Sequence, residues 1–277
     1  MTAIAAMPGT GFGRAIGDAW AMAVRDVRRM LRAPDQVVFT LISPIMFTLL
    51  FRYVFGGAIR GLGDINYVNY LIPGIAVQTA IFTSGNSGFA LAEDRSKGFV
   101  DRLRSLPMAR SAVLVGQVAA VALSNLVGLF IIVIVGLVVG FRPHSVPGLL
   151  FGFSILLAFS VATSLLFALV GLYASSSQAV NAATFPLIFP LTFASSAFVP
   201  TSTMPTWLQT FANHNPVTIV INAVRDLTLG TVTPAQRQAL FNGKSTTFLV
   251  VVSLIWTVGI AVVFGYLSVR RYNETTS

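Results

Sequence analysis

Charged side chains are absent from five long stretches of this sequence, and such stretches suit a membrane better than water. No Asp, Glu, Lys or Arg occurs between the members of these pairs: Asp35 and Arg52, Asp64 and Glu93, Arg110 and Arg142, Arg142 and Arg225, Lys244 and Arg270. One helical span needs about 20 apolar residues. The fourth stretch is long enough for two spans, so the pattern predicts six membrane-spanning helices.

The composition agrees with this interpretation. Charged residues make up 10% of the chain, against about 25% in ordinary soluble domains, and the mean hydropathy is +0.79. The apolar runs are too long, and alternate too little, for the strands of a β-barrel. We therefore expect an all-α integral membrane protein, with spans at about 36–55, 69–91, 112–140, 148–173, 179–199 and 246–268.

The basic residues predict how the chain crosses the membrane, because cytoplasmic loops carry an excess of Lys and Arg. With both termini in the cytoplasm, the inner segments hold twelve basic residues: Arg14, Arg25, Arg28, Arg29, Arg32, Arg95, Lys97, Arg102, Arg104, Arg110, Arg270 and Arg271. The outer segments hold the other six: Arg52, Arg60, Arg142, Arg225, Arg237 and Lys244. The net charge of +9 fits this distribution better than binding to nucleic acid.

An amphipathic helix is expected before the first span. Apolar residues recur at helical spacing from Ile16 through Trp20 to Met30, and the basic residues Arg25, Arg28, Arg29 and Arg32 mostly take the other side. A basic polar face suits a helix that lies on the anionic inner leaflet. The alternative is a basic flank that only orients the first span.

A charged segment, Leu91 to Pro107, separates the second and third spans and holds seven of the 27 charged side chains. From Asp94 to Leu106 we expect a helix ended by Pro107, since opposite charges stand three or four residues apart in three pairs: Asp94 with Lys97, Lys97 with Asp101, and Asp101 with Arg104. Such a helix can present Phe99 and Leu103 to a partner. The alternative is a solvated hairpin whose apolar face rests on the bilayer.

The segment between the fifth and sixth spans, Pro200 to Ser245, contains two short amphipathic pieces separated by Pro216. They run from Met204 to Phe211 and from Asn215 to Arg225. Both are too short to cross a bilayer. We expect two half-length helices that dip into the outer leaflet or lie on it.

Several function classes find no support in these residues. The chain has no cysteine, and its only histidines are His144 and His214, so neither thiolate chemistry nor a His/Cys metal cluster is indicated. No Gly-x-x-x-x-Gly-Lys-Ser/Thr sequence is present to bind a nucleotide. All Asp and Glu lie outside the expected spans, whereas ion-coupled carriers usually hold an ionisable group near the membrane midplane. These absences disfavour a membrane-embedded enzyme and an ion-coupled secondary transporter.

Three groups of residues together carry a family resemblance. They are Tyr70-Leu71-Ile72-Pro73-Gly74 with Gln78, then Glu93-Asp94-Arg95 with Gly98 and Arg102-Leu103-Arg104-Ser105-Leu106-Pro107, and finally Asn215-Pro216 followed by Arg225. With these residues the chain resembles the membrane subunit of type-2 ABC exporters, and most closely the daunorubicin/doxorubicin-resistance type of permease.

The resemblance implies an architecture and a set of partners. It implies an interfacial helix within the cytoplasmic N-terminus (1–35), a transmembrane domain (36–271) and a cytoplasmic tail (272–277), with a coupling helix after span two and a re-entrant pair before span six. Two permeases, identical or paralogous, would assemble in the cytoplasmic membrane with two cytosolic ATP-binding subunits, which would carry the ATP and Mg²⁺. The residues that would contact the ATPase are Glu93, Asp94, Arg95, Gly98, Phe99, Asp101, Arg102, Leu103, Arg104, Leu106 and Pro107.

The resemblance also places the transport path near spans one, two and five. The polar residues of spans two and five that become candidates for it are Gln78, Asn86, Asn181 and Thr184. The alternative role for these residues is helix packing, since polar side chains in membrane helices often bond to neighbouring helices. The expected cargo is a hydrophobic or amphipathic drug-like molecule or lipid, and the alternative is a lipid-linked glycan precursor.

Overall fold

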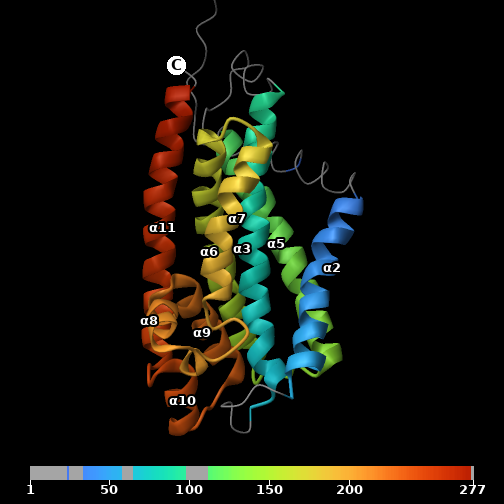
Figure 1. The fold of residues 1–277 in the computed structure, drawn as a ribbon, viewed down its shortest axis with the longest axis vertical. Helices are drawn as coiled ribbons and strands as arrows, with labels where there is room; N and C mark the ends of the chain where they lie inside the picture. Colours follow the sequence, from blue (N-terminus) through green and yellow to red (C-terminus); the bar gives the residue numbers. More distant parts are fainter. Residues whose placement is uncertain (1–23, 25–33, 58–64, 98–111, 276–277) are drawn as a thin grey trace, which may run out of the picture.

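The structure is a computed structural model that describes residues 24, 34–57, 65–97 and 112–275, and its regular elements in these ranges are helical. Long helices run side by side along the molecule (Figure 1). They are α2 (Pro34–Leu50), continued by a π-helical turn (Phe51–Phe55), α3 (Tyr67–Ser96), α5 (Ala112–Val139), α6 (Val146–Tyr173), α7 (Ser177–Phe193) and α11 (Thr246–Thr275).

Three short helices gather at one end of the bundle, which we call the α8–α10 end. They are α8 (Thr206–His214), α9 (Pro216–Leu229) and α10 (Pro234–Phe241), preceded by a 3₁₀ turn (Thr201–Thr203). The other end, where α3 finishes, is called the Ser96 end. The last turn of α11 and the start of α2 also lie toward the Ser96 end (Figure 1).

Three helical stretches of the described residues are long and apolar enough to cross a membrane by themselves: Val115–Val139, Val146–Tyr173 and Pro234–Tyr272. Ile42–Phe55 is a shorter apolar helix. α3 has 30 residues, or about 45 Å of helix, but its middle carries many amide and hydroxyl side chains. The long helices begin within two residues of the expected ranges, but three of them end elsewhere: α7 stops six residues early, and α3 and α11 continue five and seven residues further.

α7 ends at Phe193 rather than near residue 199 as expected. Past Phe193 the chain bends, and its backbone bonds to other helices. The Asn215 amide nitrogen donates to the carbonyl oxygens of Leu191 and Ala194, at 2.8 and 3.1 Å. These carbonyls would otherwise lack a partner at the helix end, so tertiary contacts, rather than local preference, determine where α7 stops.

The predicted separate helix from Asp94 to Leu106 is wrong at its beginning. Glu93, Asp94 and Arg95 form the last turn of α3, which continues to Ser96 because neither Gly nor Pro interrupts it after Gly88. Lys97 forms an ion pair with Glu93, with Nζ and Oε1 2.6 Å apart, instead of the pair expected with Asp94.

The remaining coupling residues lie outside the described part of the chain: Gly98, Phe99, Asp101, Arg102, Leu103, Arg104, Leu106 and Pro107. The residues of the expected interfacial helix lie outside it as well: Trp20, Arg25, Arg28, Arg29 and Arg32.

The two expected short helices before the last span are present as α8 and α9; a third, α10, was not predicted. Asn215 separates α8 from α9, and its side chain caps α9 by accepting from the backbone nitrogen of Val217 at 2.9 Å. α9 is buried on nearly every side and packs against α3, α6 and α11. Its apolar face is therefore covered by protein in this chain, not left for the outer leaflet.

α3 and α6 form the centre of the bundle through close backbone contact. The Ser87 hydroxyl donates to the carbonyl oxygen of Ser164 at 2.7 Å. A Cβ on Gly88 would stand 2.3 Å from the carbonyl oxygen of Phe167, and one on Gly171 would stand 2.3 Å from that of Gly88. Small and hydroxyl residues allow this approach, so part of the polar sequence of α3 serves packing.

Candidate functional site

A second group of polar residues on α3 lines a pocket that faces α2. Its α3 members are Gln78, Thr79, Phe82, Thr83 and Asn86, and its α2 members are Ser43, Pro44 and Phe47. The α3 residues follow one another at intervals of one, three or four positions, which places them on one face of a helix. The pocket has a volume of about 240 Å³.

The pocket combines two kinds of contact. All eight lining residues are uncharged; the amides of Gln78 and Asn86 and the hydroxyl groups can donate and accept hydrogen bonds, and Phe47 and Phe82 offer ring surface. Pockets that bind small molecules commonly pair apolar walls with a few polar groups that fix orientation. This lining suits a neutral or amphipathic molecule with ring surface.

The structure brings together two of the four residues predicted for the transport path and separates the other two. Gln78 and Asn86 lie in the pocket, eight positions apart on the same face of α3. Thr184 is buried on α7 and packs with its methyl group 3.3 Å from the Cβ position of Gly85. Asn181 is exposed on α7. Neither α7 residue lines the pocket.

Sequence analysis did not identify the α2 side of the pocket, nor a buried amide near it. Asn125 of α5 is 2% exposed, and its amide nitrogen has no hydrogen-bond partner among the described residues. Gly128, one turn further along α5, approaches the Thr79 methyl group, which would lie 4.0 Å from a Cβ placed on Gly128, but Asn125 itself does not line the pocket. The helical spacing of Gln78, Thr83 and Asn86 indicates a shared polar face in the sequence, whereas no sequence pattern identifies Ser43 and Phe47 as pocket residues.

α2 is inclined against the rest of the bundle beside this pocket. Its Phe55 end approaches the start of α3, and its Pro34 end lies away from α3 (Figure 1). Ser43 lies near the middle of the helical run Pro34–Phe55, and Phe47 lies one turn nearer the Phe55 end. The pocket therefore lies where α2 begins to diverge from α3 toward the Ser96 end.

A buried arginine joins three elements between the pocket and the α8–α10 end. Arg225 of α9 is 0% exposed. Its guanidinium donates to the carbonyl oxygens of Tyr70 and Ser196, at 3.0 and 2.8 Å, and to the Asn222 amide oxygen at 2.8 Å. Because these acceptors are all neutral, the bonds compensate burial of the charge without an ion pair. α9 is thereby fixed to α3 and to the bend after α7.

The same bend is held against α3 by two further contacts. The Tyr70 hydroxyl donates to the carbonyl oxygen of Ser196 at 2.8 Å, and the Tyr67 hydroxyl donates to that of Phe198 at 3.0 Å. A Cβ on Gly74 would stand 2.1 Å from the carbonyl oxygen of Ala197, so only glycine fits there. Tyr70 and Gly74, one helical turn apart, thus form the surface of α3 on which the backbone of the bend packs.

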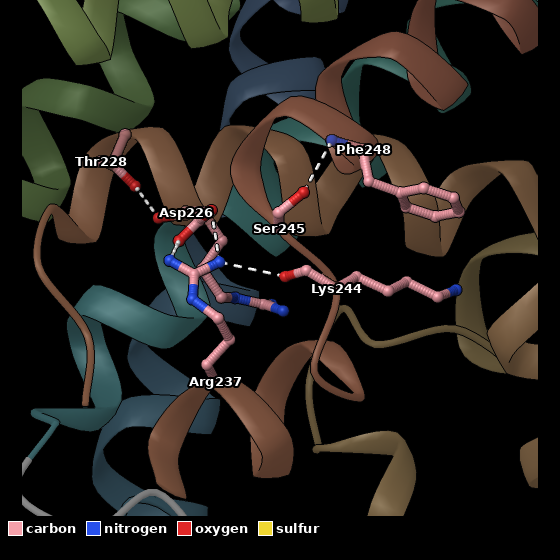
Figure 2. A network of polar contacts seen from close by, with 7 residues as sticks. Asp226, Thr228, Arg237, Lys244, Ser245 and Phe248 are labelled. Atoms are coloured by element: carbon pink, nitrogen blue, oxygen red, sulfur yellow. Dashed lines mark hydrogen bonds and ion pairs between the residues drawn. The ribbon is translucent and has the colours of Figure 1, made fainter. Parts of the chain in front are cut away.

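Next to Arg225 an ion pair ties α10 to α9. Both terminal nitrogens of Arg237 lie 3.2 Å from the carboxylate oxygens of Asp226, and one of them also donates to the Lys244 carbonyl oxygen at 3.0 Å (Figure 2). The Asp226 side chain is 1% exposed. A bidentate pair of this kind fixes geometry as well as charge, so α9 and α10 are tied together at this end of the bundle.

The opposite end of α3 is fixed to α6. Arg95 donates from Nη1 to the carbonyl oxygen of Leu172 at 2.7 Å, near the end of α6. Leu91 and Leu172 belong to a small buried cluster that also contains Tyr272 of α11. α3 is therefore attached to its neighbours at both ends, and the charged segment begins directly at the Ser96 end.

The comparison with known families assigns the chain. Residues 18–229 match the family described as ABC-2 type transporter.

The chain belongs to the ABC-2 type transporter family.

Relatives of this ABC-2 chain carry related names. The daunorubicin resistance ABC transporter permease protein DrrB1 of Streptomyces coeruleorubidus is 33% identical over 199 residues, 72% of this chain and 70% of that protein. The putative transport permease ycf38 of Cyanophora paradoxa is 28% identical over 202 residues, 72% and 70% of the two chains. The probable doxorubicin resistance permease DrrC of Mycobacterium tuberculosis is 27% identical over 241 residues, 86% and 82%. This ABC-2 chain is thus a membrane protein that is similar to transport permeases.

Proposed function

We propose that this ABC-2 chain is the permease subunit of an ATP-driven exporter that moves a hydrophobic or amphipathic small molecule out of the cell. The pocket between α2 and α3 carries the proposal, because it joins ring surface to neutral hydrogen-bonding groups. Relatives named for daunorubicin or doxorubicin resistance support a drug-like cargo. The same groups also suit a sugar, which makes a lipid-linked glycan precursor the second candidate.

The pocket is expected to form only part of the complete cargo site. Its volume of about 240 Å³ is below the range of about 300–1,000 Å³ in which drug-sized ligands are usually bound. A second permease, either another copy or a paralogue, would supply the remaining surface. The cargo would then lie between two permeases, with one pocket of this kind on each.

The energy for transport is expected to come from a cytosolic ATP-binding subunit, present in two copies. The sequence has no phosphate-binding loop of the Walker type, so ATP and Mg²⁺ belong on that partner, and this chain is expected to need no cofactor of its own. The charged segment is the proposed contact. It begins at the last turn of α3. The same helix lines the pocket further along and contacts Arg225 of α9 through Tyr70 in its first turn.

The proposed orientation follows from the basic residues. Six spans, formed by α2, α3, α5, α6, α7 and α11, would place both termini and the charged segment in the cytoplasm. The Ser96 end is then the inner end, and the α8–α10 end is the outer end. Twelve basic residues on the inner side and six on the outer side support this orientation.

Reconstitution with the ATP-binding subunit tests the proposal. We expect daunorubicin uptake into inverted vesicles to require both chains and ATP, and the purified permease alone to hydrolyse no ATP. Glu93→Ala, Arg102→Ala and Leu103→Ala should each lower uptake several-fold while the chain still inserts. Glu274→Ala, at an exposed acidic residue of the same end, is the matched control. ATPase activity of the pure permease, or full uptake by all three variants, contradicts the proposal.

A further inference from the structure

Four phenylalanine rings from two parts of the chain meet where α2 approaches the bend after α7, some stacked and some tilted. Phe47 and Phe51 come from α2 and its π-helical turn, Phe193 ends α7, and Phe198 lies in the bend. We call them the aromatic cluster. The ring centres of Phe51 and Phe198 are 4.2 Å apart with nearly parallel planes, and Phe47 lies 6.1 Å from Phe198 and 6.4 Å from Phe193.

The aromatic cluster adjoins the pocket on its outer side. Phe47 belongs to both, because it lines the pocket and stacks with Phe51 at 6.2 Å. α2 runs from the inner to the outer end, so Phe51 lies one turn beyond Phe47 toward the outside. No lining residue of the pocket comes from beyond Phe47 on α2 or beyond Gln78 on α3 within the described chain. The rings therefore stand between the pocket and the outer end.

The two sides of the aromatic cluster differ in how firmly they are held. Phe198 is 5% exposed, and its carbonyl oxygen accepts from the Tyr67 hydroxyl at 3.0 Å. The bend that carries it is also fixed by Arg225 through the carbonyl oxygen of Ser196. Phe47 and Phe51 instead stand on α2, which diverges from α3 toward its inner end (Figure 1).

Ring contacts of this kind can separate within a membrane. Lipid tails are as apolar as a phenylalanine ring, so burial from water does not hold two membrane helices together, and packing alone keeps the contact. Offset-stacked rings pack well when they meet, and each face can meet lipid or an apolar cargo when they part. A change in the inclination of α2 would separate Phe51 from Phe198 without breaking a hydrogen bond between them.

We propose that Phe47, Phe51, Phe193 and Phe198 form the outer gate of the transport path, closed in this structure, and that α2 carries the moving half. Phe198 is the fixed half, because Tyr67 and Arg225 hold the bend that carries it. The proposal rests on the proposed function for the direction of transport. It adds the residues that separate the pocket from the outside and the helix that moves to open it.

Thiol accessibility tests the gate without knowledge of the cargo. The chain has no cysteine, so Thr79→Cys places a single thiol in the pocket. We expect a membrane-impermeant maleimide added outside intact cells to label this cysteine at least tenfold faster when Phe51→Ala and Phe198→Ala are also present. Phe130→Ala is the matched control, since Phe130 is a 69% exposed phenylalanine on α5, and it should leave the labelling rate unchanged.

The outcomes of the labelling experiment separate the gate from the proposed function. Equal labelling rates with and without the two alanines contradict the gate. Fast labelling from outside in the variant that carries only Thr79→Cys also contradicts it, because the path is then open outward. If labelling supports the gate but daunorubicin uptake fails, the proposed cargo is wrong and the gate stands.

A cross-link between the two halves of the gate provides a second test, because it holds the gate closed instead of removing its rings. In Phe51→Cys with Phe198→Cys, a short bifunctional thiol reagent should reduce uptake at least tenfold, and reduction of a cleavable linker should restore it. Ser84→Cys with Thr163→Cys is the control pair, since the two hydroxyl oxygens lie 3.1 Å apart between α3 and α6. Continued uptake by the cross-linked gate pair, or an equal loss in the control pair, contradicts the proposal.

Discussion

The guanidinium of Arg225 lies over the ring of Tyr70, with Cζ 3.6 Å from the ring centre, and donates from Nε to the Tyr70 carbonyl oxygen at 3.0 Å. This contact joins α9, a buried helix of the α8–α10 end, to the first turn of α3. A cation over an aromatic face gains most when both are removed from water. The contact therefore connects α3, which ends in the charged segment, with the bend that carries Phe198.

Arg225→Lys is expected to destabilise the protein although it keeps the positive charge. Lysine lacks the planar fork that contacts Tyr70, Ser196 and Asn222 together. Loss of two or more buried bonds should cost about 2–4 kcal/mol, measured as a lower unfolding temperature in detergent. Arg142→Lys is the control, because Arg142 is exposed at the same end and its guanidinium bonds only to nearby backbone. An unfolding temperature equal to the wild type's in Arg225→Lys would show that the fork is unimportant.

Gly88→Ala is expected to disrupt the contact between α3 and α6. The added methyl group would stand 2.3 Å from the carbonyl oxygen of Phe167, so one backbone must shift. Overpacking of this kind costs about 1–3 kcal/mol or more, and the yield of folded protein in mild detergent measures it. Gly259→Ala on α11 has no atom within 4 Å of its Cβ position and should behave as wild type. Equal yields of the two variants would disprove the close approach.

The helix boundaries show what the sequence could predict. The lengths of the uncharged stretches predict the long helices well, since length and apolarity are local properties. The end of α7 was not predictable, because Asn215 and Arg225, more than 20 residues further on, bind the backbone of the bend. The predicted start of a separate helix at Asp94 was wrong for a local reason. No Gly or Pro lies between Gly88 and Gly98, so α3 continues through Glu93 and Arg95.

The candidate site was predictable only in part. Gln78 and Asn86 were predicted as transport-path candidates through the family resemblance, and both line one pocket in the structure; their part in transport stays a prediction. Ser43 and Phe47 were not predicted, because their role depends on the inclination of α2 against α3, which periodicity does not determine. Arg225 was noticed in a motif, but a sequence does not reveal that its acceptors lie 29 and 155 residues away.

Asn125→Leu is expected to keep or raise the unfolding temperature. The amide nitrogen of Asn125 is buried and has no partner among the described residues, so replacing the amide with an apolar group of similar size removes a desolvation cost. The measurement is the unfolding temperature in detergent. A drop in that temperature would contradict the prediction and indicate that the amide has a structural partner.

The most direct test of the account is ATP-dependent daunorubicin uptake by inverted vesicles that carry the complex with Gln78→Ala and Asn86→Ala together. Both amides line the pocket, so their removal should lower uptake at least tenfold while the assembled complex keeps its ATPase activity. Asn181→Ala removes an exposed amide outside the pocket and should leave uptake unchanged. Full uptake by the double variant, or a loss only in Asn181→Ala, would contradict the claim that cargo passes through the pocket between α2 and α3.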